Sequence, residues 1–191
     1  MNEKLNDLIA IELYKRRRIW KPFMEKHNCQ VIAELGIQFG TTFDLMTAHN
    51  PKIAVAVDSW TAHGTPGQND WAFDQKEMDR QYNDFKERMK DKPFVQIYRE
   101  FTHDAVKRFP DEYFDVIYID ADHTYEGCKQ DIEDWYPKVK IGGCLTGDDY
   151  RTAFIKRSGV TFGVKKAVSE FCEKNNLKHY ELPRYGWVIL K

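Results

Sequence analysis

Short apolar runs alternate along this chain with longer segments in which apolar residues recur every three or four positions. The short runs are typical of buried strands and the periodic segments of amphipathic helices. Strands that alternate with helices form a parallel sheet covered by helices on both faces. We therefore expect an α/β fold with a doubly wound, mostly parallel sheet. The predicted strands are residues 31–35, 53–57, 94–98, 116–119, 141–146, 179–182 and 187–190, and the predicted helices are residues 2–27, 41–49, 71–90, 124–135 and 163–174.

The last two predicted strands form a pair of their own. Only Pro183, Arg184, Tyr185 and Gly186 separate them, and a connection this short joins antiparallel strands. The sheet is therefore expected to end in a C-terminal antiparallel hairpin. A length of 191 residues suits one domain, 1–191, of which residues 1–29 are a helical N-terminal extension.

Carboxylates follow two of the predicted strands. Asp120, Asp122 and His123 come directly after one buried run, and Asp148 and Asp149 come after the next. Parallel neighbours present their carboxyl ends at one edge of the sheet, where open α/β sheets bind ligands. Crowded carboxylates repel each other, and a hard cation with oxygen ligands relieves that repulsion.

A glycine turn links the first strand to its helix. Gly36 and Gly40 lie in this turn, and Asp58 ends the second strand about twenty positions later, as in a nucleoside-binding βαβ unit. Asp58 would then accept hydrogen bonds from ribose hydroxyls. The dinucleotide pattern G-x-G-x-x-G fails, because Glu34 and Phe39 occupy two of its glycine positions. Glycines required only by the strand-to-helix turn explain the pattern equally well.

Two stretches at the same edge are expected to be irregular, residues 59–70 and 150–161. The first is a candidate lid or substrate wall, or a plain surface connection. Trp60, Trp71 and Tyr150 either line an acceptor pocket or cover the edge of the sheet. Thr102 is a plausible N-cap of the short helix that follows the third strand.

Composition and charge narrow the function classes. The net charge of −1 gives no overall field that favours nucleic acid or an anionic membrane. No signal peptide and no membrane-spanning run is visible, and the four scattered cysteines contain no Cys-x-x-Cys pair. We therefore expect a cytoplasmic protein with reduced thiols. The basic run at residues 15–18 is read as a solvated helix end, with an anion or RNA contact as the alternative.

Several motifs agree with one family. They are Glu34-Leu35-Gly36-Ile37-Gln38-Phe39-Gly40, Asp58, the block Asp120-Ala121-Asp122-His123-Thr124-Tyr125-Glu126-Gly127, and Gly142-Gly143 through Gly147-Asp148-Asp149-Tyr150. Together they resemble the class I S-adenosylmethionine-dependent methyltransferases, which have a Rossmann-like, seven-stranded sheet with one reversed strand. Within that class the chain looks most like a small group with an Asp-x-Asp-His-x-Tyr-x-Gly motif. That group is similar to metal-dependent O-methyltransferases of catechols, macrolides and cephalosporins.

The resemblance implies a role for each matching residue. S-adenosylmethionine would be held by Glu34, Gly36, Gly40, Thr42, Asp58, Ser59, Thr102 and Asp120. A divalent cation, Mg²⁺ or Mn²⁺, would be held by Asp120, Asp148 and Asp149, and His123 and Asp120 would be catalytic. The chain has Asp-Asp where catechol-type enzymes usually carry Asp-Asn, which suits a cation but shifts the likeness to the sugar and antibiotic relatives.

The chemistry expected is methyl transfer to an oxygen. A bound cation would lower the pKa of an acceptor hydroxyl and fix its direction, and His123, with an ordinary pKa of about 6.5, would take the proton. The acceptor is a small hydroxylated molecule or a sugar, and the N-terminal helix could pair two subunits. The alternatives are metal-independent methylation of nitrogen or oxygen, and a non-catalytic nucleoside- or RNA-binding module. His123, Asp122 and Asp148 could also be purely structural.

Overall fold

A computed structural model of the chain describes residues 3–13, 20–63, 73–156 and 159–191. The basic run at residues 15–18 and Trp71 lie outside the described residues, so their predicted roles stay predictions. None of the helices in the described part of the chain is long and apolar enough to cross a membrane.

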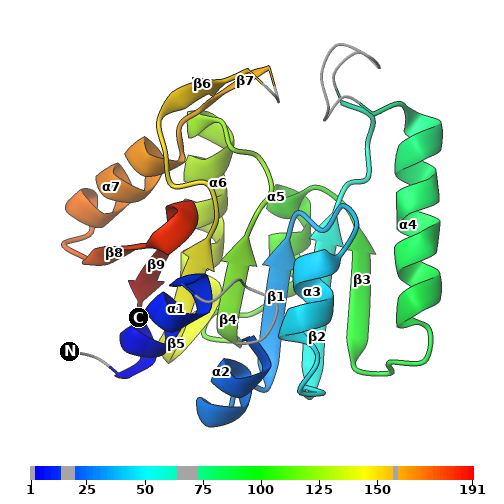
Figure 1. Cartoon of the computed structure of the whole chain (residues 1–191), viewed down its shortest axis with the longest axis horizontal. Helices are drawn as coiled ribbons and strands as arrows, with labels where there is room; N and C mark the ends of the chain where they lie inside the picture. Colours follow the sequence, from blue (N-terminus) through cyan, green and yellow to red (C-terminus); the bar gives the residue numbers. More distant parts are fainter. Residues whose placement is uncertain (1–2, 14–19, 64–72, 157–158) are drawn as a thin grey trace.

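Seven strands form one sheet in the order β3-β2-β1-β4-β5-β9-β8 (Figure 1). They are β1 (Val31–Leu35), β2 (Ile53–Asp58), β3 (Val95–Arg99), β4 (Phe114–Ile119), β5 (Val139–Gly147), β8 (His179–Leu182) and β9 (Gly186–Leu190). The first five are parallel, whereas β9 runs antiparallel to both of its neighbours. The predicted fold class, including the C-terminal hairpin, is confirmed.

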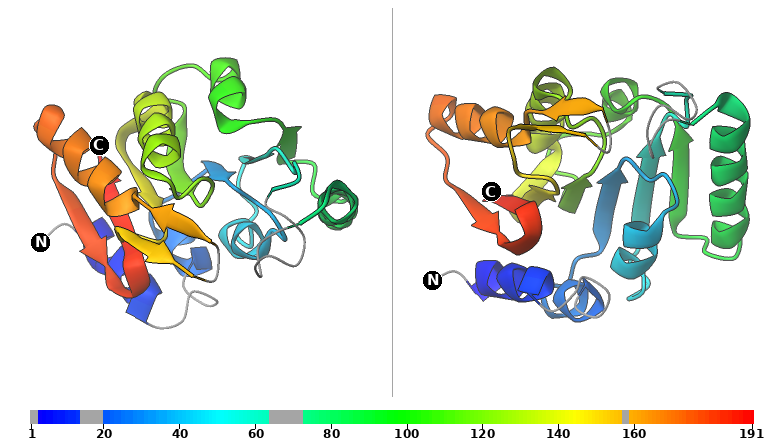
Figure 2. Two further views of the ribbon diagram at one scale, coloured as in Figure 1. Left: turned by 90° about the horizontal axis from the view of Figure 1, so that it is seen from above. Right: turned by 45° about the horizontal axis from the view of Figure 1, so that its top comes forward.

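Helices cover both faces of the sheet, because nearly every buried strand residue is apolar on either side (Figure 2). Ile32, Val116 and Tyr118 face one core, which is completed by α1 (Glu3–Leu13), α2 (Trp20–Lys26), α3 (Thr41–Met46) and α4 (Gln75–Met89). Leu35 and Ile117 face the other core, with α5 (Thr102–Ala105), α6 (Tyr125–Trp135) and α7 (Val164–Lys174). Short 3₁₀ turns follow α5, α6 and β8 at Val106–Arg108, Tyr136–Lys138 and Pro183–Tyr185.

The prediction that residues 150–161 are irregular is wrong. Strands β6 (Ala153–Ile155) and β7 (Val160–Phe162) form a small antiparallel hairpin, with Ala153 paired to Phe162. Gly159 near its tip has a φ of 70°, which glycine adopts without a steric penalty. The hairpin stands beyond the carboxyl ends of the parallel strands (Figure 1) and therefore borders the predicted ligand edge.

Thr102 is not the N-cap of the helix it begins. Phe101 occupies that position in an extended conformation, and no side chain caps the helix. The Thr102 hydroxyl instead donates a 2.5 Å hydrogen bond to Oδ1 of Asp131 on α6. The Thr102 hydroxyl thus bonds to a side chain on another helix, and not to the backbone of its own helix as the sequence suggested.

Candidate functional site

The tips of β1, β2, β4 and β5 end in register. Leu35 pairs with Val57 and with Ile119, and Ile119 pairs with Gly147. The residues that follow these pairs are Gly36, Asp58, Asp120 and Asp148. The predicted convergence of the glycine turn and the acidic cluster on one rim is therefore confirmed.

The glycine turn packs directly against the tip of β4. Gly36 has a φ of 84°, and its N–H donates to the carbonyl oxygen of Val57 at 2.9 Å. A Cβ on Gly36 would lie 2.0 Å from the carbonyl oxygen of Asp120. At Gly40, where φ is 71°, a Cβ would lie 2.5 Å from the Phe85 ring on α4. Packing within the protein already requires both glycines.

Asp58 organises this turn from the end of β2. Its Oδ2 accepts hydrogen bonds from the backbone N–H groups of Ile37 and Gln38, each at 2.8 Å, and its Oδ1 accepts one from Trp60 N–H at 2.7 Å. The carboxylate thus fixes the glycine turn and the chain after β2 at once. Its predicted contact with a ribose stays a prediction.

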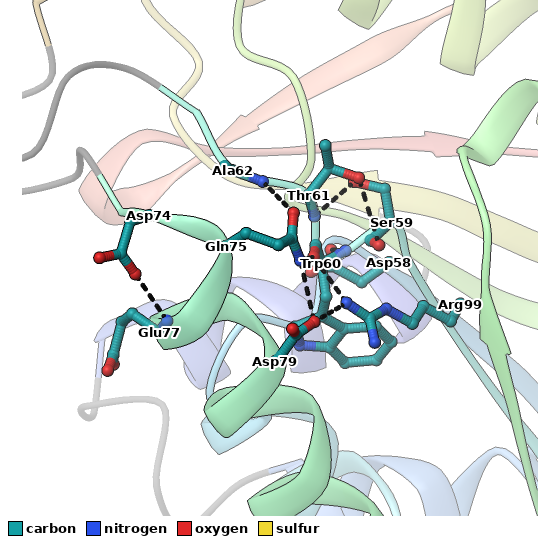
Figure 3. A network of polar contacts seen from close by, with 10 residues as sticks. All are labelled: Asp58, Ser59, Trp60, Thr61, Ala62, Asp74, Gln75, Glu77, Asp79 and Arg99. Carbon is teal, nitrogen blue, oxygen red and sulfur yellow. Dashed lines mark hydrogen bonds and ion pairs between the residues drawn. The ribbon is translucent and has the colours of Figure 1, made fainter.

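A polar network holds the chain that leaves β2 (Figure 3). The carbonyl oxygen of Trp60 accepts hydrogen bonds from Gln75 Nε2 at 3.0 Å and from an Arg99 guanidinium nitrogen at 3.2 Å. Arg99 also pairs with Asp79 on α4, and Ser59 Oγ accepts from Thr61 N–H at 3.3 Å. This network joins the ligand edge to α4 and β3.

Trp60 and Tyr150 were predicted either to line an acceptor pocket or to cover the edge of the sheet, and neither of them lines an open pocket. Trp60 is fully buried in the core beneath α4, and its indole N–H donates to the Gln38 carbonyl at 3.2 Å. Tyr150 is buried too, and its hydroxyl lies 2.6 Å from Nε2 of His179. Both residues belong to the packing of the sheet edge.

Glu34 is a charged side chain inside the sheet. It lies one residue before the end of β1, is 2% exposed, and its Oε2 has no hydrogen-bond partner. Burial raises the pKa of Glu34 well above its usual range, and the nearby carboxylates of Asp120, Asp44 and Asp58 raise it further. A buried acceptor without a donor is costly, and a cationic ligand would remove that cost.

His123 lies between two carboxylates at the rim. Its Nε2 is 3.2 Å from Oδ1 of Asp120 and 3.5 Å from Oδ2 of Asp149. Its ring stacks on Phe162 of β7, with centroids 4.7 Å apart, and its carbonyl oxygen accepts from Gly163 N–H at 2.8 Å. Burial lowers the pKa of His123, but the carboxylates of Asp120, Asp149 and Asp148 outweigh it and raise the pKa above its ordinary value.

The predicted metal ligands do not form a cation site as they stand. In the ranges that the structure describes, no group of three or more His, Cys, Asp or Glu side chains is placed to hold a metal ion. Asp149, with a φ of 52°, has left the sheet as expected, but its Oδ1 pairs with the guanidinium of Arg151. Asp120, Asp148 and Asp149 therefore do not fit a divalent cation in this arrangement.

The remaining predicted residues lie around this rim. Thr42 is half-buried in the first turn of α3. Oδ1 of Asp122 accepts from Thr124 N–H at 2.8 Å, the turn-capping role that was its structural alternative. Thr102 reaches Asp131, whose pKa burial raises to about 7.

Sequence reasoning missed three residues here. Arg151 lies in the stretch expected to be irregular and was given no role, and Phe162 lies between that stretch and the predicted helix at residues 163–174. Asp131 lies on the buried face of α6, where a charged residue at an apolar position of the helical repeat was the available signal.

Several solved structures with the same fold are methyltransferases. The O-methyltransferase NovP has a TM-score of 0.60 at 17% identity, over 96% of this chain and 78% of NovP. The O-methyltransferase from Bacillus cereus in complex with SAH has a TM-score of 0.63 at 13% identity, over 100% of this chain and 92% of that one. SAH-bound PaMTH1, a methyltransferase of Podospora anserina, has a TM-score of 0.64 at 12% identity, over 100% of this chain and 88% of PaMTH1. At such identities the likeness shows the fold alone.

The sequence itself carries the family assignment. A family model described as "Methyltransferase domain" matches residues 33–150, well over half of the chain and all of the rim from Glu34 to Tyr150. No curated protein matches the sequence at a significant level. The chain belongs to the methyltransferase domain family and is an enzyme of that kind.

Proposed function

We propose that this enzyme transfers a methyl group from S-adenosylmethionine to a hydroxyl oxygen of a small molecule, with His123 as the proton acceptor. The position of His123 carries the proposal: its Nε2 lies at the rim where β1 and β4 meet, between Asp120 and Asp149. Two of the similar structures are O-methyltransferases by name, which supports oxygen as the acceptor atom.

The residues around the glycine turn fit a cationic nucleoside. When bound, S-adenosylmethionine supplies an electrophilic methyl group on a positively charged sulfur. Glu34 offers a buried carboxyl oxygen without a partner, and the carboxylates of Asp58 and Asp120 place negative charge close by. Glu34, Gly36, Gly40, Thr42, Asp58, Ser59, Thr102 and Asp120 remain the residues expected to hold the cofactor. The match of charge favours a sulfonium over a neutral nucleoside.

His123 is suited to accept a proton from an acceptor hydroxyl. A neutral hydroxyl is a poor nucleophile, so removing its proton as the new bond forms lowers the barrier. Nε2 would accept that proton, and the carboxylates of Asp120 and Asp149 would stabilise the imidazolium. The stacked Phe162 ring holds the imidazole plane in place.

The acceptor would lie between the rim and the β6–β7 hairpin. Phe162 of this hairpin contacts His123, and Phe154 and Tyr185 are exposed aromatic residues of the hairpin and of the turn before β9. Aromatic surface suits a flat acceptor or the apolar face of a sugar ring. A small hydroxylated molecule or a sugar therefore remains the proposed acceptor.

The experiment measures release of S-adenosylhomocysteine over a panel of small hydroxylated acceptors. We expect His123→Gln to reduce turnover about 100-fold while the dissociation constant of S-adenosylhomocysteine changes little. His27→Gln is the matched control, because His27 lies 2.8 Å from Asp7 in a similar His–carboxylate pair on other elements. Full activity of His123→Gln would exclude His123 as the base.

Metal assistance through Asp120, Asp148 and Asp149 is the alternative mechanism that the motif resemblance predicts. It requires that EDTA abolish turnover and that Mg²⁺ restore it. Activity that persists in EDTA would leave His123 as the group that activates the hydroxyl.

A further inference from the structure

Asp149 is paired with a side chain that always carries a positive charge. The guanidinium of Arg151 pairs with its Oδ1, and Arg151 N–H donates to the Asp149 carbonyl oxygen at 2.6 Å. The two residues are thus joined through side chain and backbone directly after β5. A guanidinium stays charged at every pH at which a protein is folded.

Arg151 is also held from its other side. Its guanidinium carbon lies 4.1 Å from the centroid of the Tyr185 ring and 5.7 Å from that of Phe162. Its carbonyl oxygen accepts from Lys165 N–H on α7 at 3.3 Å, and only 33% of its side chain is exposed. Two rings and a carboxylate therefore fix the cation at one place.

The rim places two basic side chains, His123 and Arg151, beside its carboxylates. Asp120 and Asp149 each face Nε2 of His123, and Arg151 supplies the positive charge next to Asp149. A divalent cation at Asp149 would have to displace Arg151 from Oδ1, or share the carboxylate with Arg151 through Oδ2, which lies 3.5 Å from Nε2 of His123. Phe162 contacts both Arg151 and His123, so the position of one affects the other.

We infer that Arg151 takes the place of a divalent cation at Asp149 and positions His123 through Asp149 and Phe162, so that this enzyme works without a metal. Arg151 is a positioning residue, because it acts through its neighbours and not on the methyl group. The part of the inference that concerns His123 rests on the proposed function, whereas the part that concerns metal binding does not.

Mn²⁺ binding, followed by electron paramagnetic resonance of the free ion, tests the inference on the full chain. We expect Arg151→Met to bind Mn²⁺ at the rim at least about tenfold more tightly than the wild type does. The double variant Arg151→Met/Asp149→Asn should lose that gain. Arg151→Lys keeps a cation and should behave as the wild type, which separates loss of charge from misfolding.

Arg108 provides the matched control. It pairs with Glu100 at 2.5 Å and stacks over the Tyr98 ring at 5.4 Å, so Arg108→Met removes a similar contact elsewhere. It should leave Mn²⁺ binding unchanged. Wild-type Mn²⁺ binding that Asp149→Asn abolishes would overturn the inference, as would an Arg151→Met variant that binds Mn²⁺ no better than the wild type.

Turnover gives an independent readout. We expect wild-type activity to persist in EDTA, and Arg151→Met to lower kcat while the dissociation constant of S-adenosylhomocysteine stays the same. Loss of wild-type turnover in EDTA would contradict the inference. Absence of methyl transfer under all conditions would refute the proposed function instead, and the Mn²⁺ measurement would still decide the metal question.

Discussion

Gly36 and the backbone of Asp120 are packed so closely that a Cβ on Gly36 would lie 2.0 Å from the Asp120 carbonyl oxygen. This contact joins the turn after β1 to the end of β4, and Asp120 N–H donates to the Leu35 carbonyl at 2.8 Å beside it. The proposed cofactor turn is therefore packed directly against the end of β4, three residues before the proposed base His123.

Gly36→Ala should destabilise the fold strongly. The substitution combines a φ of 84° with a backbone clash, and we expect a loss of about 3–5 kcal/mol in the free energy of unfolding. Urea denaturation measures it. Gly142→Ala is the control, because Gly142 has a φ of 83° with nothing within 4 Å of the added carbon, and should cost only about 1–2 kcal/mol. Equal losses in the two variants would mean that the contact with Asp120 is unimportant.

Glu34→Gln should separate stability from cofactor binding. Burial raises the pKa of Glu34, so its ionisation costs stability as the pH rises, and the neutral amide avoids that cost. Without bound cofactor, we expect Glu34→Gln to be at least as stable as the wild type at neutral pH. If Glu34 faces the cationic cofactor, affinity for S-adenosylmethionine should fall about tenfold. Titration calorimetry measures the affinity, and an unchanged value would remove Glu34 from the cofactor site.

Turnover should increase with pH through a value above the ordinary histidine pKa. His123 acts as a base only when neutral, and its pKa is raised because the surrounding carboxylates outweigh the effect of burial. Asp120→Asn removes one of these carboxylates, so the ascending limb of the pH–rate profile should move to lower pH even though the maximum rate falls. Asp111→Asn, which removes a carboxylate paired with Lys138, should leave the limb in place. A limb that does not respond to Asp120→Asn would show that another group titrates.

Asp131 should make the protein less stable as the pH rises. Its folded pKa of about 7 lies above the unfolded value of 3.8, chiefly because of burial. The folded state therefore keeps a proton that the unfolded state loses, and stability falls between these two pH values by up to about 4 kcal/mol. Asp131→Asn keeps an acceptor for the Thr102 hydroxyl and lacks this penalty. Urea denaturation measures the free energy of unfolding at pH 5 and pH 8. Relative to the wild type, Asp131→Asn should be more stable at pH 8 than at pH 5. The same difference at both pH values would contradict the raised pKa of Asp131.

The pattern of the chain was enough to predict the sheet. Apolar runs that alternate with helical segments predict a parallel sheet covered on both faces, because burial on both faces demands continuous apolar strands. The same pattern placed Asp58, Asp120 and Asp149 at one edge, since parallel strands end together. It failed at residues 150–161, where β6 and β7 are three residues each and too short for an alternating pattern to identify them.

The sequence by itself determined which chemical groups stand at the strand ends, and the motifs around them determined the family. Only the tertiary structure decided how those groups are partnered: Asp58 with the backbone of the glycine turn, Thr102 with Asp131, and Asp149 with Arg151. The reason is physical. Periodicity records which side of a helix or strand is buried, whereas the partner of a charge depends on which distant segments meet there, and that geometry decides whether a carboxylate binds a cation, a backbone N–H or an arginine.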